Sequence, residues 1–361
     1  MTSIINKLLP DSIRELKPYE SARRLLSGGK DWLNANESPY ANAYTLDTST
    51  LNRYPECQPE QVIKSYADYA GIQIDNVLAT RGADEGIELL IRTFCMPGKD
   101  SILICPPTYG MYAISAKTCN VGVQEVPLNI DFSLDVEGIK ARKGEVNIVF
   151  ICSPNNPTGT GVNADDIEAI LTHYQDSALV VVDEAYVEFS PTSEWASTLK
   201  KYENLVVLRT LSKAFALAGL RCGFTLANPA TIQALLKVIA PYPISAPVAQ
   251  IAEQALSPKG ISIMKAQVRE LQRQQIALQV ALSEFPQLSP VGSTKANFLL
   301  YRCNERETLM PYLIERGILL RDQSKQRGLD NCIRVSVGNA EQNQRLVEAI
   351  TAFYASQEVS S

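Results

Sequence analysis

A lysine, a serine and an arginine stand at spacings that suit one chemical task. Lys213 directly follows Ser212 and precedes an apolar stretch, and Arg221 comes eight positions after the lysine. A lysine buried in such a stretch can lose its proton, act as a nucleophile and form a Schiff base with an aldehyde. Ser212 and Arg221 would then supply hydrogen-bond donors for a phosphate group on the same ligand.

Further upstream, an apolar run delivers an acid at its end. Residues 180–182 are three valines, and Asp183 follows them directly. Pyridoxal phosphate needs an amine for its aldehyde, an acid for its pyridinium nitrogen and donors for its phosphate. The two segments together therefore predict a site for this cofactor.

Other segments with polar or aromatic residues follow expected strands. Residues 81–86 open a helix, and the backbone amides at a helix start bind anions. Tyr109, in a turn after two prolines, can stack on a flat ring, although a tyrosine in a turn is often simply packed. Asn156 and Tyr186 can both reach the cofactor's phenolic oxygen, whereas an Asn-Pro pair is also an ordinary turn.

These residues depend on an alternating pattern of strands and helices. Short β-branched runs alternate with helical segments between residues 77 and 227, and this alternation is typical of an α/β fold with a mostly parallel sheet covered by helices on both faces. Such sheets bind ligands at the carboxyl ends of their strands. The expected strands span residues 77–80, 101–105, 121–127, 146–152, 178–182, 205–209 and 222–227.

The chain of 361 residues is long enough for a large and a small domain. After Pro247 the pattern changes to a long helix at 261–284, a strand at 296–301, a helix at 305–316, short strands at 318–321 and 333–337, and a last helix from residue 340. We expect an arm at 1–45 that packs on the small domain or on a neighbour, a large cofactor-binding domain at 46–245 and a small C-terminal domain at 246–361.

Composition argues against several other classes of protein. The 34 basic and 39 acidic residues give a net charge of −5, and no basic block would track a nucleic acid. The N-terminus has no signal-peptide pattern, and no apolar run is long enough to span a membrane. We therefore expect a cytoplasmic protein that binds neither nucleic acid nor membrane.

The cysteines and the histidine argue against metal and hydrolase chemistry. The 8 cysteines never form a Cys-x-x-Cys pair, and the chain has 1 histidine, His173. A Cys/His metal site is therefore not expected, and the cysteines are expected to be reduced. A Ser-His-Asp triad would have to use His173, which disfavours that type of hydrolase.

The chain resembles the fold-type I pyridoxal phosphate enzymes, and among them the histidinol-phosphate aminotransferases. The resemblance implies the PLP-dependent transferase fold type I, with a seven-stranded sheet between helices and a smaller C-terminal α/β domain. It covers essentially the whole chain and rests on residues 33–37, 52–59, 82–85, 153–159, 183–186 and 210–223.

The resemblance implies a role for each cofactor-site residue. Lys213 would be the Schiff-base lysine and the acid–base group, Asp183 would hold the pyridinium proton, and Tyr186 would complete the catalytic set. Asn156 and Tyr186 would bind the ring hydroxyl, and Tyr109 would stack on the ring. The cofactor phosphate would be bound by Ala83, Asp84, Ser212 and Arg221.

The resemblance also implies substrate contacts and a shared site. Tyr54 matches a tyrosine that reaches the cofactor phosphate of the neighbouring subunit, which implies a homodimer with shared active sites. Arg321 and Arg334 match arginines that hold the anionic end of the substrate, although Arg334 could instead be a surface charge on a strand. The remaining residues expected in the substrate pocket are Tyr19, Asn36 and Asn156.

The reaction expected from the resemblance is a ping-pong transamination. It converts L-histidinol phosphate and 2-oxoglutarate to imidazole-acetol phosphate and L-glutamate in histidine biosynthesis. The alternatives are an aromatic or broad-range aminotransferase, a phospho-amino-acid decarboxylase of the same fold, and a non-catalytic binding protein that retains the cofactor fold.

Overall fold

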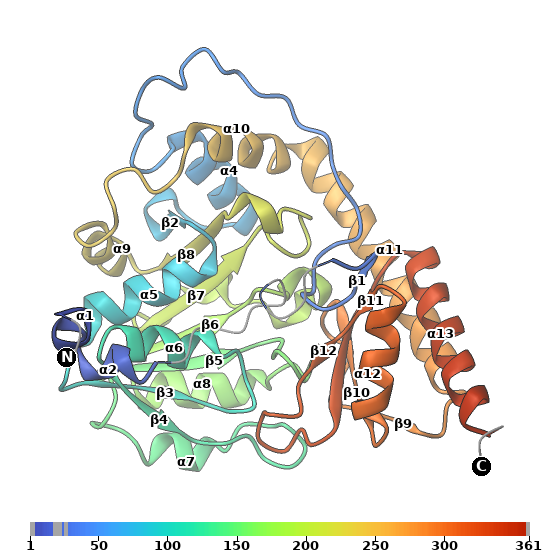
Figure 1. The fold of residues 1–361 in the computed structure, drawn as a ribbon. Helices are drawn as coiled ribbons and strands as arrows, with labels where there is room; N and C mark the ends of the chain where they lie inside the picture. Colours follow the sequence, from blue (N-terminus) through green and yellow to red (C-terminus); the bar gives the residue numbers. More distant parts are fainter. Residues whose placement is uncertain (1–3, 17–23, 25–27, 359–361) are drawn as a thin grey trace.

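The computed structural model describes residues 4–16, 24 and 28–358, and a large mixed sheet lies at its centre (Figure 1). This 7-stranded sheet has the order β2-β8-β7-β6-β5-β3-β4. Only β8 (Gly223–Ala227) runs against its neighbours, β2 (Val77–Thr80) and β7 (Leu205–Thr210). The prediction of a mostly parallel α/β sheet is therefore confirmed.

The sheet strands lie within two residues of their expected bounds. The other four are β3 (Ser101–Ile104), β4 (Gly122–Glu125), β5 (Ile148–Cys152) and β6 (Leu179–Asp183). Every residue of β5 and β7 is buried, as expected for strands that helices cover on both faces. The continuous apolar runs in the sequence reflect this double burial.

Two hydrophobic layers flank the sheet. One face packs against α5 (Ala83–Phe94), α6 (Met111–Thr118) and α9 (Pro229–Leu236). The opposite face packs against α4 (Glu60–Ala70), α7 (Val136–Lys140), α8 (Ala164–His173) and α10 (Ala246–Ala255). Alternate residues of each strand enter the two layers, because successive side chains of a strand point to opposite faces.

Three helices beside the large sheet end or begin at residues suited to helix caps. Gly71 ends α4 with φ 69°, a left-handed conformation that glycine adopts without strain. The side chain of Asn163 accepts a hydrogen bond from Asp165 N at 3.1 Å and so caps α8. Asn228 caps α9 in the same way, through Ala230 N at 2.9 Å.

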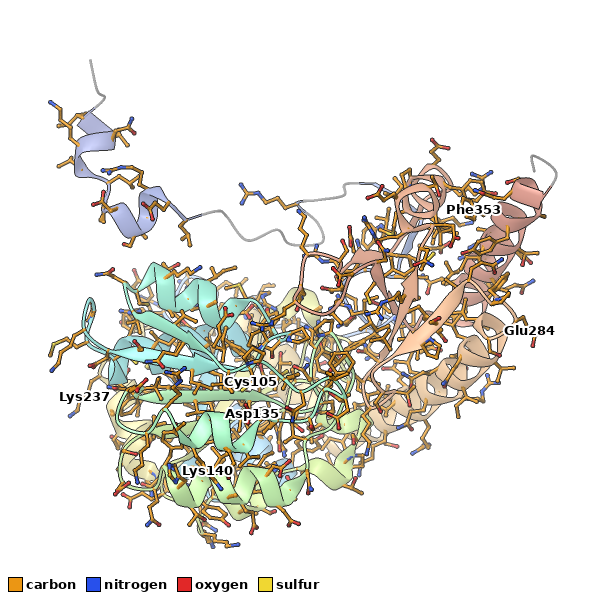
Figure 2. All side chains as sticks on the ribbon, turned by 90° about the horizontal axis from the view of Figure 1, so that it is seen from below. Cys105, Asp135, Lys140, Lys237, Glu284 and Phe353 are labelled. Atoms are coloured by element: carbon orange, nitrogen blue, oxygen red, sulfur yellow. The ribbon has the colours of Figure 1, made fainter. Side chains whose placement is uncertain are left out.

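A second, smaller sheet lies in the C-terminal part. Its order is β12-β13-β10-β9, with β9 (Leu288–Val291), β10 (Phe298–Cys303), β12 (Arg321–Asp322) and β13 (Cys332–Ser336) all antiparallel to their neighbours. It packs with α11 (Pro258–Leu282), α12 (Arg306–Glu315) and α13 (Ala340–Glu358). Figure 2 shows Glu284 and Phe353 in this part, apart from Cys105 and Lys140 in the large sheet's surroundings.

The N-terminal segment connects the two parts. The short helix α1 (Ile4–Leu8) precedes α2 (Asp11–Arg14), which contacts α6. Strand β1 (Asp31–Trp32) pairs in parallel with β11 (Ile318–Leu319). Residues 33–59 then cross from the small sheet to α10 (Figure 1). Thr45 N donates to the side chain of Gln254 at 3.0 Å, which fixes this segment on α10.

The remaining elements are short 3₁₀ turns at Ile74–Asn76, Val187–Phe189, Pro191–Ser193, Ala196–Thr198 and Ala218–Leu220. In the part of the chain that the structure describes, no helix combines the length and apolarity needed to cross a membrane. Within the same residues, no group of His, Cys, Asp and Glu is arranged to hold a metal ion.

Candidate active site

A cavity of about 500 Å³ lies between the two sheets, where β5, β6 and β7 end. This is the edge of the sheet at which α/β proteins bind ligands. Its size suits a small organic ligand. The predicted site residues that line it are Asn36, Ala83, Asp84, Tyr109, Asn156, Asp183, Tyr186, Ser212, Lys213, Arg221, Arg321 and Arg334.

Lys213 brings an amine into this cavity from the loop after β7. Its Nζ donates a hydrogen bond to the Ala35 carbonyl at 3.0 Å. Burial and, to a smaller extent, the positive charge of Arg334 together lower the pKa of the Lys213 amine to about 8. A useful fraction of this amine is therefore unprotonated, and nucleophilic, near neutral pH.

Asp183 ends β6 and presents a buried carboxylate. Its Oδ2 accepts a hydrogen bond from Tyr112 Oη at 2.7 Å, and its Oδ1 accepts one from Ala185 N at 3.1 Å. Burial raises the pKa of Asp183 to about 6, while these two donors oppose the rise. The carboxylate is thus mainly ionised at pH 7 and can hold a proton on a heterocyclic nitrogen.

Tyr186 and Asn36 meet on another wall of the cavity. Asn36 Nδ2 donates to Tyr186 Oη at 2.9 Å. The Asn36 main chain is held in turn, because its N–H donates to Ser336 Oγ at 2.7 Å and its carbonyl accepts from Asn297 Nδ2 at 3.0 Å. Burial raises the pKa of Tyr186 above its ordinary value, so its hydroxyl remains a hydrogen-bond donor at neutral pH.

The start of α5 and Arg221 form a cluster of donors. Arg221 Nη2 donates to Asp84 Oδ2 at 3.1 Å, and Arg221 Nη1 donates to Ser212 Oγ at 3.3 Å. Tyr109 Oη donates to the other carboxylate oxygen of Asp84 at 2.9 Å. Backbone N–H groups at a helix start attract anions, so this cluster can bind a phosphate.

Two glycines make the close approach within this cluster possible. A Cβ on Gly82, whose φ is +77°, would stand 2.6 Å from Arg221 Nη2. A Cβ on Gly223 would stand 2.6 Å from Ala83 N. Any larger residue at these positions would displace the Arg221 guanidinium or the Ala83 amide.

Two arginines reach the cavity from the small sheet. Arg321 on β12 and Arg334 on β13 are register partners. Arg334 is 6% exposed, donates through Nη2 to the Asn34 carbonyl at 3.0 Å, and donates through Nη1 to Asn156 Oδ1. The alternative interpretation of Arg334 as a surface charge on a strand is therefore wrong.

Among the predicted site residues that the structure describes, Tyr54 does not line the cavity. Tyr54 is 81% exposed and stacks on Tyr242, with ring centroids 4.4 Å apart. Tyr19 lies outside the residues that the structure describes.

Sequence reasoning gave no role to several groups in or behind the cavity. Tyr112, which donates to Asp183, lies in the apolar pattern of α6 and resembles an ordinary core residue. Asn34 was part of a motif, but its carbonyl contact with Arg334 joins residues 300 positions apart. Gln323 and Gln326 also line the cavity and are linked by a 2.9 Å hydrogen bond. In the sequence, only the position of two polar residues just after a strand could have indicated that they belong to the site.

The groups of this cavity fit pyridoxal phosphate. Lys213 supplies an amine of lowered pKa, Asp183 an ionised carboxylate, and Arg221 with the start of α5 a set of anion donors. The two glycines described above let Arg221 and the start of α5 approach each other closely. The fold and this set of groups are those of a PLP-dependent aminotransferase.

The comparisons with known proteins agree. The family described as "Aminotransferase class I and II" matches residues 28–350. The chain is 58% identical over 361 residues to "Histidinol-phosphate aminotransferase" of Pseudoalteromonas atlantica. This alignment covers 99% of this chain and 97% of that protein. It is 53% identical over 346 residues to the protein of the same name from Yersinia pseudotuberculosis, covering 96% of this chain and 91% of the relative. The chain belongs to the class I and II aminotransferases and, within them, to the histidinol-phosphate aminotransferases.

Solved structures agree with the fold. The histidinol-phosphate aminotransferase from Clostridium acetobutylicum superimposes with a TM-score of 0.78 at 26% identity, covering 84% of this chain and 91% of that one. The enzyme from Sinorhizobium meliloti, solved in complex with pyridoxal-5'-phosphate, has a TM-score of 0.84 at 22% identity and covers 96% and 98% of the two chains. These superpositions show that the chain shares the fold of both enzymes.

Proposed function

We propose that this chain transfers the amino group of L-histidinol phosphate to 2-oxoglutarate, giving imidazole-acetol phosphate and L-glutamate in histidine biosynthesis. The observation that carries this proposal is the 58% identity, over 361 residues, with a protein named for that substrate. The pair Arg321 and Arg334 adds a chemical reason, because guanidinium groups bind phosphate and carboxylate alike. One pocket can then accept histidinol phosphate and glutamate in turn.

Each cavity residue has a proposed part in holding the cofactor. Ser212, Arg221 and the backbone amides of Ala83 and Asp84 bind its phosphate. Tyr109 stacks on its ring, while Asn156 and Tyr186 bind its ring hydroxyl. When bound, pyridoxal phosphate supplies an aldehyde that takes up the amino group and a protonated ring that withdraws electrons.

Two side chains manage the protons in this proposal. Lys213 Nζ, with its pKa lowered to about 8, takes a proton from the substrate carbon that bears the amino group. It then delivers this proton to the cofactor carbon that receives the amino group. Asp183, ionised at neutral pH, keeps a proton on the ring nitrogen. Tyr186 keeps its phenolic proton and orients the ring with Asn36.

We further propose a cytoplasmic homodimer with shared active sites. Tyr54 lies outside its own chain's cavity and is 81% exposed, so it is available to the cavity of a second copy. There it would reach the cofactor phosphate and the substrate. Tyr19 would line the substrate pocket. The division into an arm at 1–45, a large domain at 46–245 and a small domain at 246–361 belongs to the same proposal.

One assay separates this function from its alternatives. Purified protein is incubated with histidinol phosphate and 2-oxoglutarate, and the glutamate formed is measured. Phenylalanine and O-phosphothreonine replace histidinol phosphate in parallel. We expect kcat/KM to favour histidinol phosphate by at least about a hundredfold.

Each alternative has its own outcome in this assay. Faster turnover of phenylalanine would indicate an aromatic or broad-range aminotransferase, and release of carbon dioxide from O-phosphothreonine would indicate a decarboxylase. Binding of cofactor without turnover of any of the three would indicate a non-catalytic binding protein.

A further inference from the structure

Tyr112 is a buried residue of α6 that has no part in the roles given above. Its ring is fully buried and stacks on Phe150 of β5, with centroids 4.8 Å apart and planes inclined by 12°. Its hydroxyl donates to Asp183 Oδ2 at 2.7 Å. The stack leaves the phenol no other rotamer to adopt without repacking the core, so the hydroxyl is held at this carboxylate.

Asp183 is thereby held at both oxygens. Tyr112 Oη binds Oδ2, and Ala185 N binds Oδ1 at 3.1 Å. Two donors on different oxygens fix the plane of the carboxylate. Each oxygen keeps a second lone pair, so the group can still accept a proton-bearing nitrogen from the cavity.

We propose that Tyr112 is a positioning residue, whose hydroxyl holds the Asp183 carboxylate in the orientation that pairs with the ring nitrogen of pyridoxal phosphate. The inference rests on the proposed role of Asp183 and goes beyond it, because it names the group on which that role depends. It does not depend on which amine the protein uses as a substrate.

The charges around Asp183 indicate a second effect of the same bond. Burial raises the pKa of Asp183, whereas the Tyr112 and Ala185 donors and the charge of Lys213 lower it. Burial and the charge of Asp183 also raise the pKa of Tyr112, so its hydroxyl stays protonated and remains a donor. The titratable groups that face Asp183 from the surrounding elements are Asp84, Tyr112, Cys152, Tyr186 and Lys213.

Removal of the Tyr112 hydroxyl should therefore change the pKa of Asp183 in one direction. Without Tyr112 Oη, the pKa of Asp183 rises from about 6 toward neutral pH, and more of the carboxyl is uncharged at pH 7. An uncharged Asp183 loses its attraction for a protonated ring nitrogen. The loss is largest at low pH and smallest where the carboxyl is ionised in both proteins.

The test measures cofactor binding to apoprotein rather than turnover. Tyr112→Phe and the unchanged protein are titrated with pyridoxal phosphate and with a carbocyclic analogue that has C–H in place of the ring nitrogen. We expect Tyr112→Phe to weaken binding of pyridoxal phosphate by about tenfold or more, as for a hydrogen bond to a charged group. Binding of the analogue should change by less than about twofold, because it has no nitrogen for Asp183 to hold. The ratio of dissociation constants should be larger at pH 6 than at pH 8.5.

Two further variants make the outcome decisive. Tyr174 is also fully buried, and it donates to the Ile139 carbonyl at 2.6 Å, so Tyr174→Phe removes a comparable hydroxyl away from Asp183. Asp183→Ala should weaken pyridoxal phosphate but not the analogue. Equal weakening of both ligands by Tyr112→Phe, no weakening of either, or the same selective loss in Tyr174→Phe would overturn the proposal for Tyr112. If Asp183→Ala itself does not discriminate between the two ligands, the role of Asp183 is wrong and the inference fails with it.

Discussion

Arg321 and Arg334 lie opposite each other in the antiparallel ladder of β12 and β13, and both line the cavity that contains Lys213. The ladder thus directs two permanently charged guanidinium groups from one small sheet at one ligand. Arg334 is oriented by the Asn34 carbonyl and Asn156 and lies 5.3 Å from the centre of the Phe298 ring. Two cations at one end of a cavity favour a ligand with an anionic end.

Replacement of Arg334 should impair both half-reactions while the cofactor stays bound. In Arg334→Ala we expect kcat/KM for histidinol phosphate and for glutamate to fall by at least about a hundredfold, as when one partner of a buried charge pair is removed. Arg302→Ala is a matched control, because Arg302 donates to the carbonyls of Asp330 and Gly328 and does not line the cavity. A variant that lost one substrate and kept the other would indicate two separate anion sites.

Lys213→Ala should separate cofactor binding from chemistry. The donors at Ser212, Arg221 and the start of α5 remain, so the variant should still bind pyridoxal phosphate but lose nearly all turnover. Borohydride should link the cofactor covalently to Lys213 in the unchanged protein and not in the variant, as peptide mass spectrometry can establish. Ordinary turnover in Lys213→Ala would contradict the proposed mechanism.

The pKa of Lys213 predicts how cofactor capture depends on pH. The unprotonated amine is the reactive form, and with a pKa of about 8 its fraction rises as the pH increases. Capture of pyridoxal phosphate by apoprotein should therefore quicken about tenfold between pH 7 and pH 9, measured by stopped-flow absorbance. The charge of Arg334 lowers this pKa, so Arg334→Gln should move the midpoint upward. A rate that falls with rising pH would be the opposite of this expectation.

A buried ion pair beneath the site should control stability. Arg209 Nε donates to Glu184 Oε2 at 2.7 Å, and the two side chains are 6% and 0% exposed. In Arg209→Met the buried Glu184 loses its cation, and we expect a loss of about 3–5 kcal/mol in the free energy of unfolding. Arg92→Met, which removes an exposed pair with Glu88, should cost less than about 1 kcal/mol in the same denaturant titration. Similar losses in the two variants would refute this ranking.

Mixed dimers test the shared site. Tyr54→Ala and Lys213→Ala proteins, each nearly inactive, are unfolded, mixed in equal amounts and refolded. Half of the dimers should be mixed, and each of these has one site with an intact Lys213 and the partner's intact Tyr54, so recovery should approach about one quarter of full activity. Mixed dimers without activity would mean that Tyr54 serves its own subunit, and a fully active Tyr54→Ala protein would show that this contact is dispensable.

Local sequence patterns determined the elements of the large sheet and one end of the site. Continuous β-branched runs predicted β5, β6 and β7, because strands buried on both faces need apolar residues at every position. The acid after such a run, Asp183, had to lie at a carboxyl strand end, which is where ligands bind. The same reasoning predicted that the lysine segment and the start of α5 lie at this edge of the sheet.

The tertiary structure alone decided the strand order, the reversal of β8 and the contacts between distant segments. Asn36 meets Tyr186 across 150 positions, Arg334 meets Asn34 across 300, and Tyr112 meets Asp183 across 71. A periodic pattern reports only which face of an element is apolar, so it gave no role to Tyr112 and left open a surface position for Arg334. The partner of a buried polar group is set by the packing of whole elements against one another, and that packing is a property of the complete chain rather than of any segment.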